Sequence, residues 1–384
     1  MNETRHFHKV VFDLHGRKLV VVGKPGVWSW AVVNPGTAAL LEIPSFAPRM
    51  NILDLGCGTG VIGAFTAASV PQALVTLVDC NAVAVACATR TLEANGLDNA
   101  RVLLGDGVES LNSTSYDLVL SHLPRGRRVQ QELIRGAARV LRPEGRFIFA
   151  ASTQVGIKGC VEYARDLFGR CGVVRQKKAY HAAMAVRPPG MEPPADRDLY
   201  VSRHIVVDDA DTVLVSKPGV FAWDRLDAGT ECLVRAMTVA KQDRVLDLGC
   251  GTGFAGLVAA RRAPEGEVVL VDSDLRAVRS ATRTLAANGI RNAHVILSDG
   301  VSAIEDSDPF DVVITNPPFH QGREVDLEVT REFVDGARRV TRPGGRLFLV
   351  ANRFIRYDDL MRDIFGNVEV AQADRSYQVL TATA

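Results

Sequence analysis

The sequence predicts two tandem α/β domains, each built on a mostly parallel, doubly wound sheet. Three observations support this fold class. The chain repeats itself at a constant spacing, short β-branched runs alternate with helical stretches in each copy, and a glycine-rich turn follows the first buried strand of each copy. Continuous apolar strands separated by helices are typical of parallel sheets that are covered on both faces.

A tandem duplication is visible directly in the letters. DLGCGTG at 54–60 returns unchanged at 247–253, an offset of 193 residues, and residues 89–107 match residues 282–300 at 13 of 19 positions with the same offset. Between the copies, RPPGMEPPADRD contains four prolines and is expected to be an extended linker. We therefore expect domains at 1–190 and 191–384.

Within the second copy the elements follow one another in a regular order. LVVVGKPGVW in the first copy and VLVSKPGVF in the second predict an added β-hairpin with a Pro-Gly turn. Strands and helices then alternate, and Gly289 is expected to end the second helix. The expected strands are 244–250, 267–272, 294–299 and 311–316, and the expected helices are 254–264 and 275–289.

Composition excludes several classes of protein. Of the 384 residues, 47% are hydrophobic and 23% are charged, which is typical of a globular protein of two or three domains. No apolar run approaches the roughly 18 to 20 residues of a membrane-spanning helix, and the start, MNETRHFHKV, lacks an apolar signal core. A cytoplasmic location is therefore expected. The seven cysteines form no CxxC pair, so we expect reduced thiols and no metal site.

The glycine-rich turn of the second copy is typical of a nucleotide-type site. Gly251 and Gly253 begin a Gly-x-Gly-x-x-Gly pattern between a strand and a helix, and Asp272 follows about 20 residues later, where a carboxylate can bind both ribose hydroxyls. By itself this pattern also fits a nicotinamide dinucleotide. Three features favour S-adenosylmethionine instead: Asp247 would repel a pyrophosphate, Asp299 can accept from an adenine amino group, and NPPF at 316–319 follows a strand at the ligand-binding edge.

These residues carry a family resemblance. The second half of the chain resembles class I S-adenosylmethionine-dependent methyltransferases. Through RLDAGT, DLGCGTG, NPPFHQG, RPGGRLFLVANRF and IFGN it is similar, more narrowly, to the bacterial ribosomal RNA guanine-N2 methyltransferases. The resemblance implies two Rossmann-like methyltransferase domains, of which the second is catalytic and the first is its degenerate partner. The cofactor would be held through Asp247, Gly249, Gly251, Gly253, Asp272 and Asp299.

The NPPF tetrapeptide suits methylation of an exocyclic amine, which is a poor nucleophile because its lone pair is delocalised. Asn316 can offer a side-chain carbonyl oxygen, and Pro317 can offer a backbone carbonyl in the stiff unit that it forms with Pro318. Phe319 can stack on the target base. The same logic serves adenine N6 in DNA or a glutamine amide in a protein, and a non-catalytic RNA-binding protein is a further alternative.

Four other residues near these motifs have two interpretations each. His320 either lines the rim of the pocket or shuttles a proton. Lys217, Asp227 and Thr230 would, by the resemblance, lie near the cofactor or the substrate, but a hairpin turn and a helix N-cap explain them equally well.

The first copy retains the glycine loop but not the tetrapeptide. Asp54, Gly56, Gly58, Gly60, Asp79 and Asp106 persist, whereas NPPF is replaced by His122, Leu123, Pro124 and Arg125. We expect this copy to transfer no methyl group, and whether it binds the cofactor is left open.

Charge divides unequally between the two copies. Residues 1–190 contain 22 Lys and Arg against 14 Asp and Glu, a net charge of +8, and residues 191–384 contain 23 against 30, a net charge of −7. RGRR at 125–128 and RQKK at 175–178 lie in the basic half. This asymmetry predicts that the first domain docks ribosomal RNA. A monomer is expected.

Overall fold

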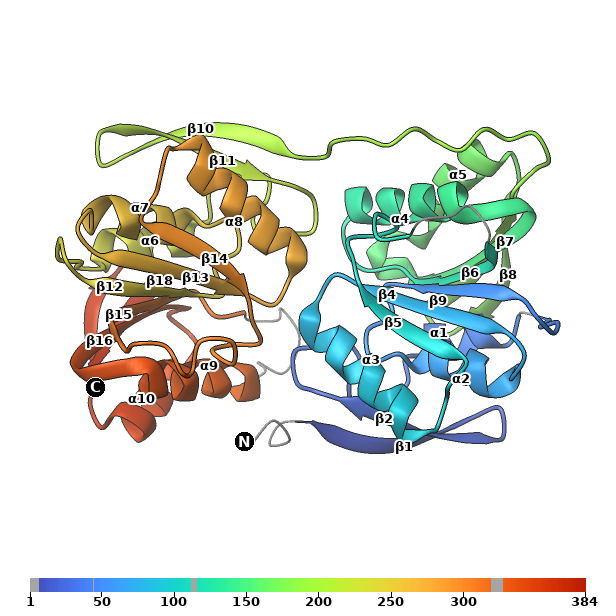
Figure 1. Ribbon diagram of the computed structural model, residues 1–384, viewed down its shortest axis with the longest axis horizontal. Helices are drawn as coiled ribbons and strands as arrows, with labels where there is room; N and C mark the ends of the chain where they lie inside the picture. The colour runs from blue at the N-terminus through green and yellow to red at the C-terminus, as the bar shows by residue number, and fades with distance from the viewer. Residues whose placement is uncertain (1–6, 44, 112–115, 319–326) are drawn as a thin grey trace. The chain divides into compact units, whose positions relative to one another are not determined.

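A computed structural model of the protein describes residues 7–43, 45–111, 116–318 and 327–384. The chain forms two compact units, residues 1–197 and 198–384, and each is described by itself (Figure 1). Residues 187–197 pack on the first unit: Arg135 donates to the carbonyl of Ala195, and Arg139 pairs with Asp196 at 2.7 Å.

The second unit contains one seven-stranded sheet. Its strand order is β14-β13-β12-β15-β16-β18-β17; the first five strands are parallel, and β18 is antiparallel to both β16 and β17. The predicted mostly parallel sheet is therefore confirmed. The strands are β12 Arg244–Leu248, β13 Glu267–Asp272, β14 Ala293–Leu297, β15 Phe310–Thr315, β16 Thr341–Asn352, β17 Glu369–Ala373 and β18 Tyr377–Thr383.

Helices cover both faces of this sheet. Leu233, Leu257 and Ala281, from three helices, share one buried cluster with Val245 and Leu270 of the central strands. A second cluster on the opposite face joins the other two helices to alternate residues of the same strands. Strands buried on both faces explain the continuous apolar runs in the sequence. The helices are α6 Ala228–Ala236, α7 Phe254–Arg262, α8 Leu275–Ala287, α9 Leu327–Val340 and α10 Tyr357–Phe365.

The first unit repeats this arrangement. Its strand order is β5-β4-β3-β6-β7-β9-β8, with two buried clusters on opposite faces. Its strands are β3 Asn51–Leu55, β4 Leu74–Asp79, β5 Ala100–Leu104, β6 Tyr116–His122, β7 Leu141–Ser152, β8 Cys171–Lys177 and β9 Tyr180–Val186. Its helices are α1 Pro35–Leu41, α2 Val61–Ser69, α3 Ala82–Ala94, α4 Arg127–Val140 and α5 Ile157–Phe168, with a 3₁₀ turn at Thr153–Val155.

Each unit begins with a hairpin, but the predicted Pro-Gly turn is wrong. The hairpins are β1 His8–Leu14 with β2 Arg17–Gly23, and β10 Val201–Val207 with β11 Ala210–Ser216. They turn at His15-Gly16 and Asp208-Asp209, where both residues have positive φ, as a two-residue turn between twisted strands requires. The Lys-Pro-Gly segments follow the second strand of each hairpin instead.

Side chains on a helix hold each hairpin in place. Thr284 and Asn288 at the end of α8 accept hydrogen bonds from the backbone N–H groups of Val215 and Val213, both at 3.0 Å. Thr91 and Asn95 make the equivalent contacts with β2 in the first unit. The repeated Thr and Asn in the two helices therefore satisfy edge-strand donors. Gly289, with φ 66°, follows the last residues of α8, which confirms the predicted helix end.

Cysteines and polar clusters show no sign of cross-linking or metal binding within the described ranges. The seven cysteines are free thiols, six of them buried. Across the described residues, no group of three or more His, Cys, Asp or Glu side chains could hold a metal ion. No helix in that part of the chain combines the length and apolarity that crossing a membrane needs.

Candidate active site

The glycine loop of the second unit lies between β12 and α7, at the carboxyl edge of the parallel strands. Asp272 at the end of β13 organises it: one carboxylate oxygen accepts from the N–H of Gly251 at 3.0 Å, and the other accepts from the N–H of Asp274 at 2.9 Å. Burial raises the pKa of Asp272 to about 6. Ligand hydroxyls that donate to this carboxylate stabilise its charged form, as bound ribose would.

Two glycines of this loop have distinct physical roles. Gly251 has φ 53°, and a Cβ built on it would meet no atom within 4 Å, so the loop presents open space there. A Cβ on Gly253 would instead lie 2.8 Å from the Cβ of Ala281, because α7 and α8 pack closely at that point. One glycine thus leaves room for a ligand, and the other lets two helices approach.

Asp247 lies beneath the loop rather than in front of it. Only 3% of its surface is exposed, and its carboxylate accepts from the N–H of Gly256 at 2.8 Å. Burial raises the pKa of Asp247 to about 7. The structure therefore gives this residue a role in supporting the loop, and its predicted contact with a cationic ligand stays a prediction.

Asn316 follows β15 at the same edge, and its side-chain amide is held in one orientation. Its Nδ2 donates to Asp227 Oδ2 at 3.1 Å and to Thr230 Oγ1 at 2.9 Å. A carboxylate can only accept, so the NH₂ group of Asn316 must face Asp227 and its Oδ1 must point away from that pair. No hydrogen bond from the described residues occupies Oδ1, so this oxygen can accept from a substrate.

Asp227 and Thr230 fit the helix-cap interpretation and also contact Asn316, whereas their place near the cofactor or the substrate stays a prediction. Asp227 is the N-cap of α6, where its carboxylate accepts from the N–H of Thr230 at 2.8 Å, and the same two side chains hold Asn316. Lys217 is buried with its Nζ 5.4 Å from the centre of the Tyr200 ring. It directly follows β11, outside the turn of the hairpin, and its place near the cofactor or the substrate stays a prediction.

Of the remaining predicted site residues, the structure describes some and not others. Pro317 is buried and Pro318 is exposed directly after Asn316, and Asp299 is half-buried after β14 at the same edge. Phe319 and His320 lie outside the described residues. Gly249 also belongs to the loop, with φ 78°.

Two aromatic residues near the site were missed from the sequence. A Cβ on Gly249 would lie 3.0 Å from the Phe333 ring of α9, and a Cβ on Gly229 would lie 3.0 Å from the Tyr377 ring of β18. Burial raises the pKa of Tyr377, and the negative charge of Asp227 raises it further. Both residues are far from the motifs in sequence. The signal that could have found Tyr377 is its repetition in the first copy, because Tyr180 lies at the start of β9 as Tyr377 lies at the start of β18.

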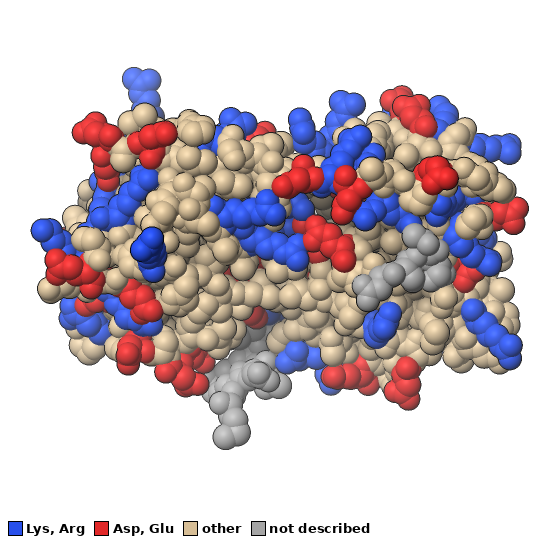
Figure 2. Space-filling view, turned by 45° about the horizontal axis from the view of Figure 1, so that its top comes forward, with Lys and Arg blue, Asp and Glu red and all other residues tan. Residues whose placement is uncertain are grey.

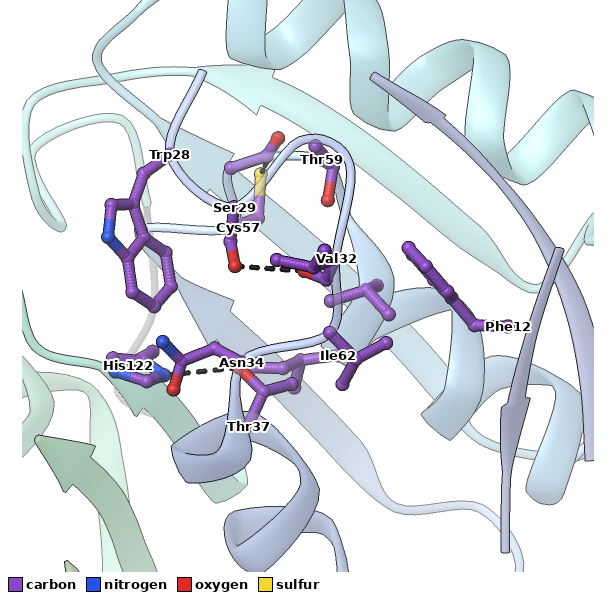
Figure 3. Close-up of a pocket in the computed structure, with 14 residues that line it drawn as sticks. Phe12, Trp28, Ser29, Val32, Asn34, Thr37, Cys57, Thr59, Ile62 and His122 are labelled. Atoms are coloured by element: carbon purple, nitrogen blue, oxygen red, sulfur yellow. Dashed lines mark hydrogen bonds between the residues drawn. The ribbon is translucent and has the colours of Figure 1, made fainter. Parts of the chain in front are cut away.

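The corresponding place in the first unit is a pocket of different chemistry (Figure 3). His122 takes the place of Asn316, with its Nδ1 3.1 Å from Thr37 Oγ1 and its ring 4.4 Å from the Trp28 ring. Asn34 takes the place of Asp227 and donates to the Tyr180 hydroxyl. Burial lowers the pKa of His122 to about 4, so the ring is neutral near pH 7. At the two corresponding positions, the amide of Asn316 is thus replaced by an imidazole and the carboxylate of Asp227 by an amide.

Comparison with known proteins agrees with the fold and the site, which together define a tandem class I methyltransferase. The model of the methyltransferase small domain matches residues 18–183 and again 211–381. The chain therefore belongs to the methyltransferase small domain family, in the group that contains ribosomal RNA small subunit methyltransferase C.

Relatives within this group are similar over different lengths. The chain is 39% identical to ribosomal RNA small subunit methyltransferase C of Hahella chejuensis over 52% of this chain and 57% of that protein. It is 32% identical to the Pseudomonas syringae pv. syringae protein of the same name over 72% of this chain and 81% of that one. Several of the matches thus span only about half the length of the curated relatives.

One solved structure is similar over nearly the whole chain. It is the Thermus thermophilus 16S ribosomal RNA N2 G1207 methyltransferase in complex with AdoMet and guanosine. The TM-score is 0.83 at 31% identity, and the match covers 98% of both chains.

The contact between Asp227 and Asn316 leads to a first prediction. Asp227→Asn keeps a good helix N-cap but allows the facing amide of Asn316 to turn over, so we expect kcat for methyl transfer to fall about tenfold to a hundredfold. KM for the methyl donor should stay within about twofold, since the glycine loop is untouched. Steady-state kinetics checks both values. A rise in KM for the methyl donor with an unchanged kcat would instead indicate that Asp227 contributes to binding of the methyl donor.

Proposed function

We propose that this chain is an S-adenosylmethionine-dependent methyltransferase that acts on the exocyclic N2 amine of a guanine in ribosomal RNA. The second unit is the catalytic one. The observation that supports this most strongly is the oriented amide of Asn316 at the sheet edge that also holds the glycine loop. The names of the relatives and the AdoMet and guanosine in the similar structure agree with this substrate and this cofactor.

The residues present suit the cofactor. The open space at Gly251, the carboxylate of Asp272 beside it and Asp299 after the next strand offer a cradle, a partner for ribose hydroxyls and an acceptor for an adenine amino group. When bound, S-adenosylmethionine supplies a methyl group activated by a positive sulfonium. The carboxylates at this edge favour a ligand of that charge.

The chain's own contribution to the reaction is to shape the nucleophile. Asn316 Oδ1 and the backbone carbonyl of Pro317 accept hydrogen bonds from the two hydrogens of the guanine amine, which withdraws its lone pair from the ring and aims it at the methyl carbon. The new N–CH₃ bond forms as the S–CH₃ bond breaks. The amine nitrogen then releases a proton to water, so the site needs no strong general base.

A methyl-transfer assay tests this function. Tritiated S-adenosylmethionine is incubated with ribosomal RNA, DNA and protein fractions, and the RNA is supplied both naked and as separated ribosomal subunits. We expect label in ribosomal RNA, recovered as N2-methylguanosine after nuclease digestion. Mass spectrometry of ribosomal RNA from a deletion strain then gives the nucleotide and the subunit. Label in N6-methyladenine or glutamine, or RNA binding without any turnover, would contradict the proposal.

The first unit is proposed to dock the RNA. Arg125, Arg127 and Arg128 are exposed at the start of α4, where the helix dipole is already positive, so these charges destabilise the free helix and suit an anionic ligand. The second basic cluster is partly neutralised, because Glu42 pairs with Arg175 at 2.6 Å and Lys177 at 3.7 Å. Both basic and acidic side chains occur on the face of the molecule in Figure 2.

Reversing the three charges at the start of α4 tests this docking role. We expect Arg125→Glu, Arg127→Glu and Arg128→Glu together to weaken RNA binding and to flatten the dependence of log K on log salt by about two to three units, close to one unit for each phosphate that is no longer neutralised. Filter binding at several salt concentrations measures the slope. The matched control replaces the same three residues by lysine and should retain the slope. If the slope of log K against log salt is the same for the glutamate and the lysine triple variants, these three arginines do not contact the RNA.

A further inference from the structure

The glycine loop of the first unit has kept the geometry of the second. Gly56, Gly58 and Gly60 have φ values of 78°, 55° and 77°, against 78°, 53° and 78° for their counterparts in the second loop. The N–H of Gly58 donates to Asp79 at 2.9 Å, as that of Gly251 does to Asp272 at 3.0 Å. Gly60 has a packing role, because a Cβ there would lie 2.9 Å from Ala88, whereas Gly58 leaves open space in the loop as Gly251 does.

The loop also faces a pocket. A Cβ built on Gly56 or Gly58 would meet no atom within 4 Å, and both glycines line the hollow shown in Figure 3. Trp28 and His122 lie on one side of this hollow, and Phe12 lies opposite them. Trp28 is 57% exposed although it is a large apolar residue. The pocket therefore combines the glycine backbone with the rings of Trp28, His122 and Phe12 and with aliphatic side chains, a mainly apolar lining with a few polar groups that is typical of small-molecule sites.

A buried carboxylate beneath the loop is incompletely satisfied. Asp54 is fully buried, and its Oδ2 accepts from the N–H of Gly63 at 2.8 Å, whereas its Oδ1 has no hydrogen-bond partner. Burial raises the pKa of Asp54 to about 7. A buried carboxyl oxygen without a partner costs stability, so the retention of Asp54 in a degenerate copy needs a reason.

We propose that the first unit is a second, non-transferring site for an S-adenosyl nucleoside, either S-adenosylmethionine or S-adenosylhomocysteine. Asp79 at the end of β4 and Asp106 after β5 take the places of Asp272 and Asp299, so the partners for ribose and adenine are present twice. The same carboxylates disfavour the pyrophosphate of a dinucleotide. Only the choice of ligand rests on the proposed function.

The pocket also explains why binding here leads to no reaction. His122 replaces the amide that would orient a target amine, and its neutral ring is packed against Trp28 at 4.4 Å. Leu123, which is buried, replaces the first proline. The ligand in this unit is therefore held as a structural cofactor that stabilises the folded first unit by mass action.

Binding stoichiometry tests the proposal on the full-length chain. Equilibrium dialysis with labelled S-adenosylhomocysteine should give two equivalents for the unmodified protein. The matched variants Gly58→Asn and Gly251→Asn place the same side chain into the open space of each loop, and asparagine tolerates a φ near 55° best among residues with a Cβ. Each single variant should bind one equivalent, and the double variant should bind none.

Three outcomes would overturn the proposal. In the first, the unmodified chain binds one equivalent of S-adenosylhomocysteine and Gly251→Asn binds none. In the second, Gly58→Asn still binds two equivalents. In the third, NAD⁺ displaces the label from the first unit at a lower concentration than S-adenosylmethionine does. Circular dichroism checks that each variant is folded. If Gly58→Asn unfolds, the matched pair Asp79→Asn and Asp272→Asn provides the same comparison with a smaller change. Methylation of ribosomal RNA by the unmodified chain is scored separately, so failure of this proposal leaves the proposed function intact.

Discussion

Replacing Asn316 by alanine should lower kcat for methyl transfer about a hundredfold to a thousandfold, with KM for S-adenosylmethionine nearly unchanged. The substitution removes Oδ1, which the contacts of Nδ2 with Asp227 and Thr230 hold in one direction and which we propose accepts from the target amine. Removing a single preorganised hydrogen-bonding group from a reacting centre typically has an effect of this size. The hydrogen bonds of the Asn316 side chain go to Asp227 and Thr230 rather than to the glycine loop or Asp272, so the cofactor should bind as before.

Single-turnover methylation of ribosomal RNA measures this effect on the chemical step. The KM for the methyl donor is the internal control, since an intact value shows that the site has kept its shape. An unchanged turnover would remove Asn316 from the reaction, and a large rise in KM would place it in cofactor binding instead.

Asp272→Ala should raise KM for S-adenosylmethionine about a hundredfold or more. In the proposed cofactor site, the substitution would remove two hydrogen bonds from ribose hydroxyls to a charged acceptor, each worth about 1.5 to 3 kcal/mol. The N–H groups of Gly251 and Asp274 are also left without their acceptor, so the loop itself becomes less ordered. Steady-state kinetics at saturating RNA measures the change.

Asp272→Asn is the matched comparison for this effect. It keeps one carbonyl oxygen as an acceptor but removes the negative charge, so we expect a KM between those of the unmodified protein and the alanine variant. A KM that changes less than about threefold in Asp272→Ala would show that the ribose is held elsewhere. In that case the proposed role of Asp299 in adenine binding would need the same test.

Much of the fold could be predicted from local patterns. β12 and β13 come from short, mostly apolar runs of the sequence, and the helix end at Gly289 follows from the need for a left-handed residue there. The hairpin turn was misplaced, because Lys-Pro-Gly is a stronger turn signal than His-Gly or Asp-Asp. The pairing register of β1 with β2, and of β10 with β11, places the turns at His15-Gly16 and Asp208-Asp209 instead.

The site was predictable only in part, because it depends on contacts between residues that are distant in sequence. Asn316 could be placed at the end of a strand from its neighbours in sequence. Its orientation depends on Asp227 and Thr230, which are more than 80 residues earlier in the chain and meet it only because α6 begins beside the end of β15. Such long-range contacts leave no periodicity in a single sequence.

The sequence by itself determined the duplication, the alternation of strands and helices, the two glycine loops and the absence of an NPPF tetrapeptide from the first copy, because each is a matter of residue type and spacing. Tertiary structure alone decided that Asp247 supports the loop from below, that the amide of Asn316 has one orientation, and that Trp28 packs on His122. These depend on side chains brought together from separate elements, where burial and hydrogen-bond direction, rather than local pattern, set the outcome.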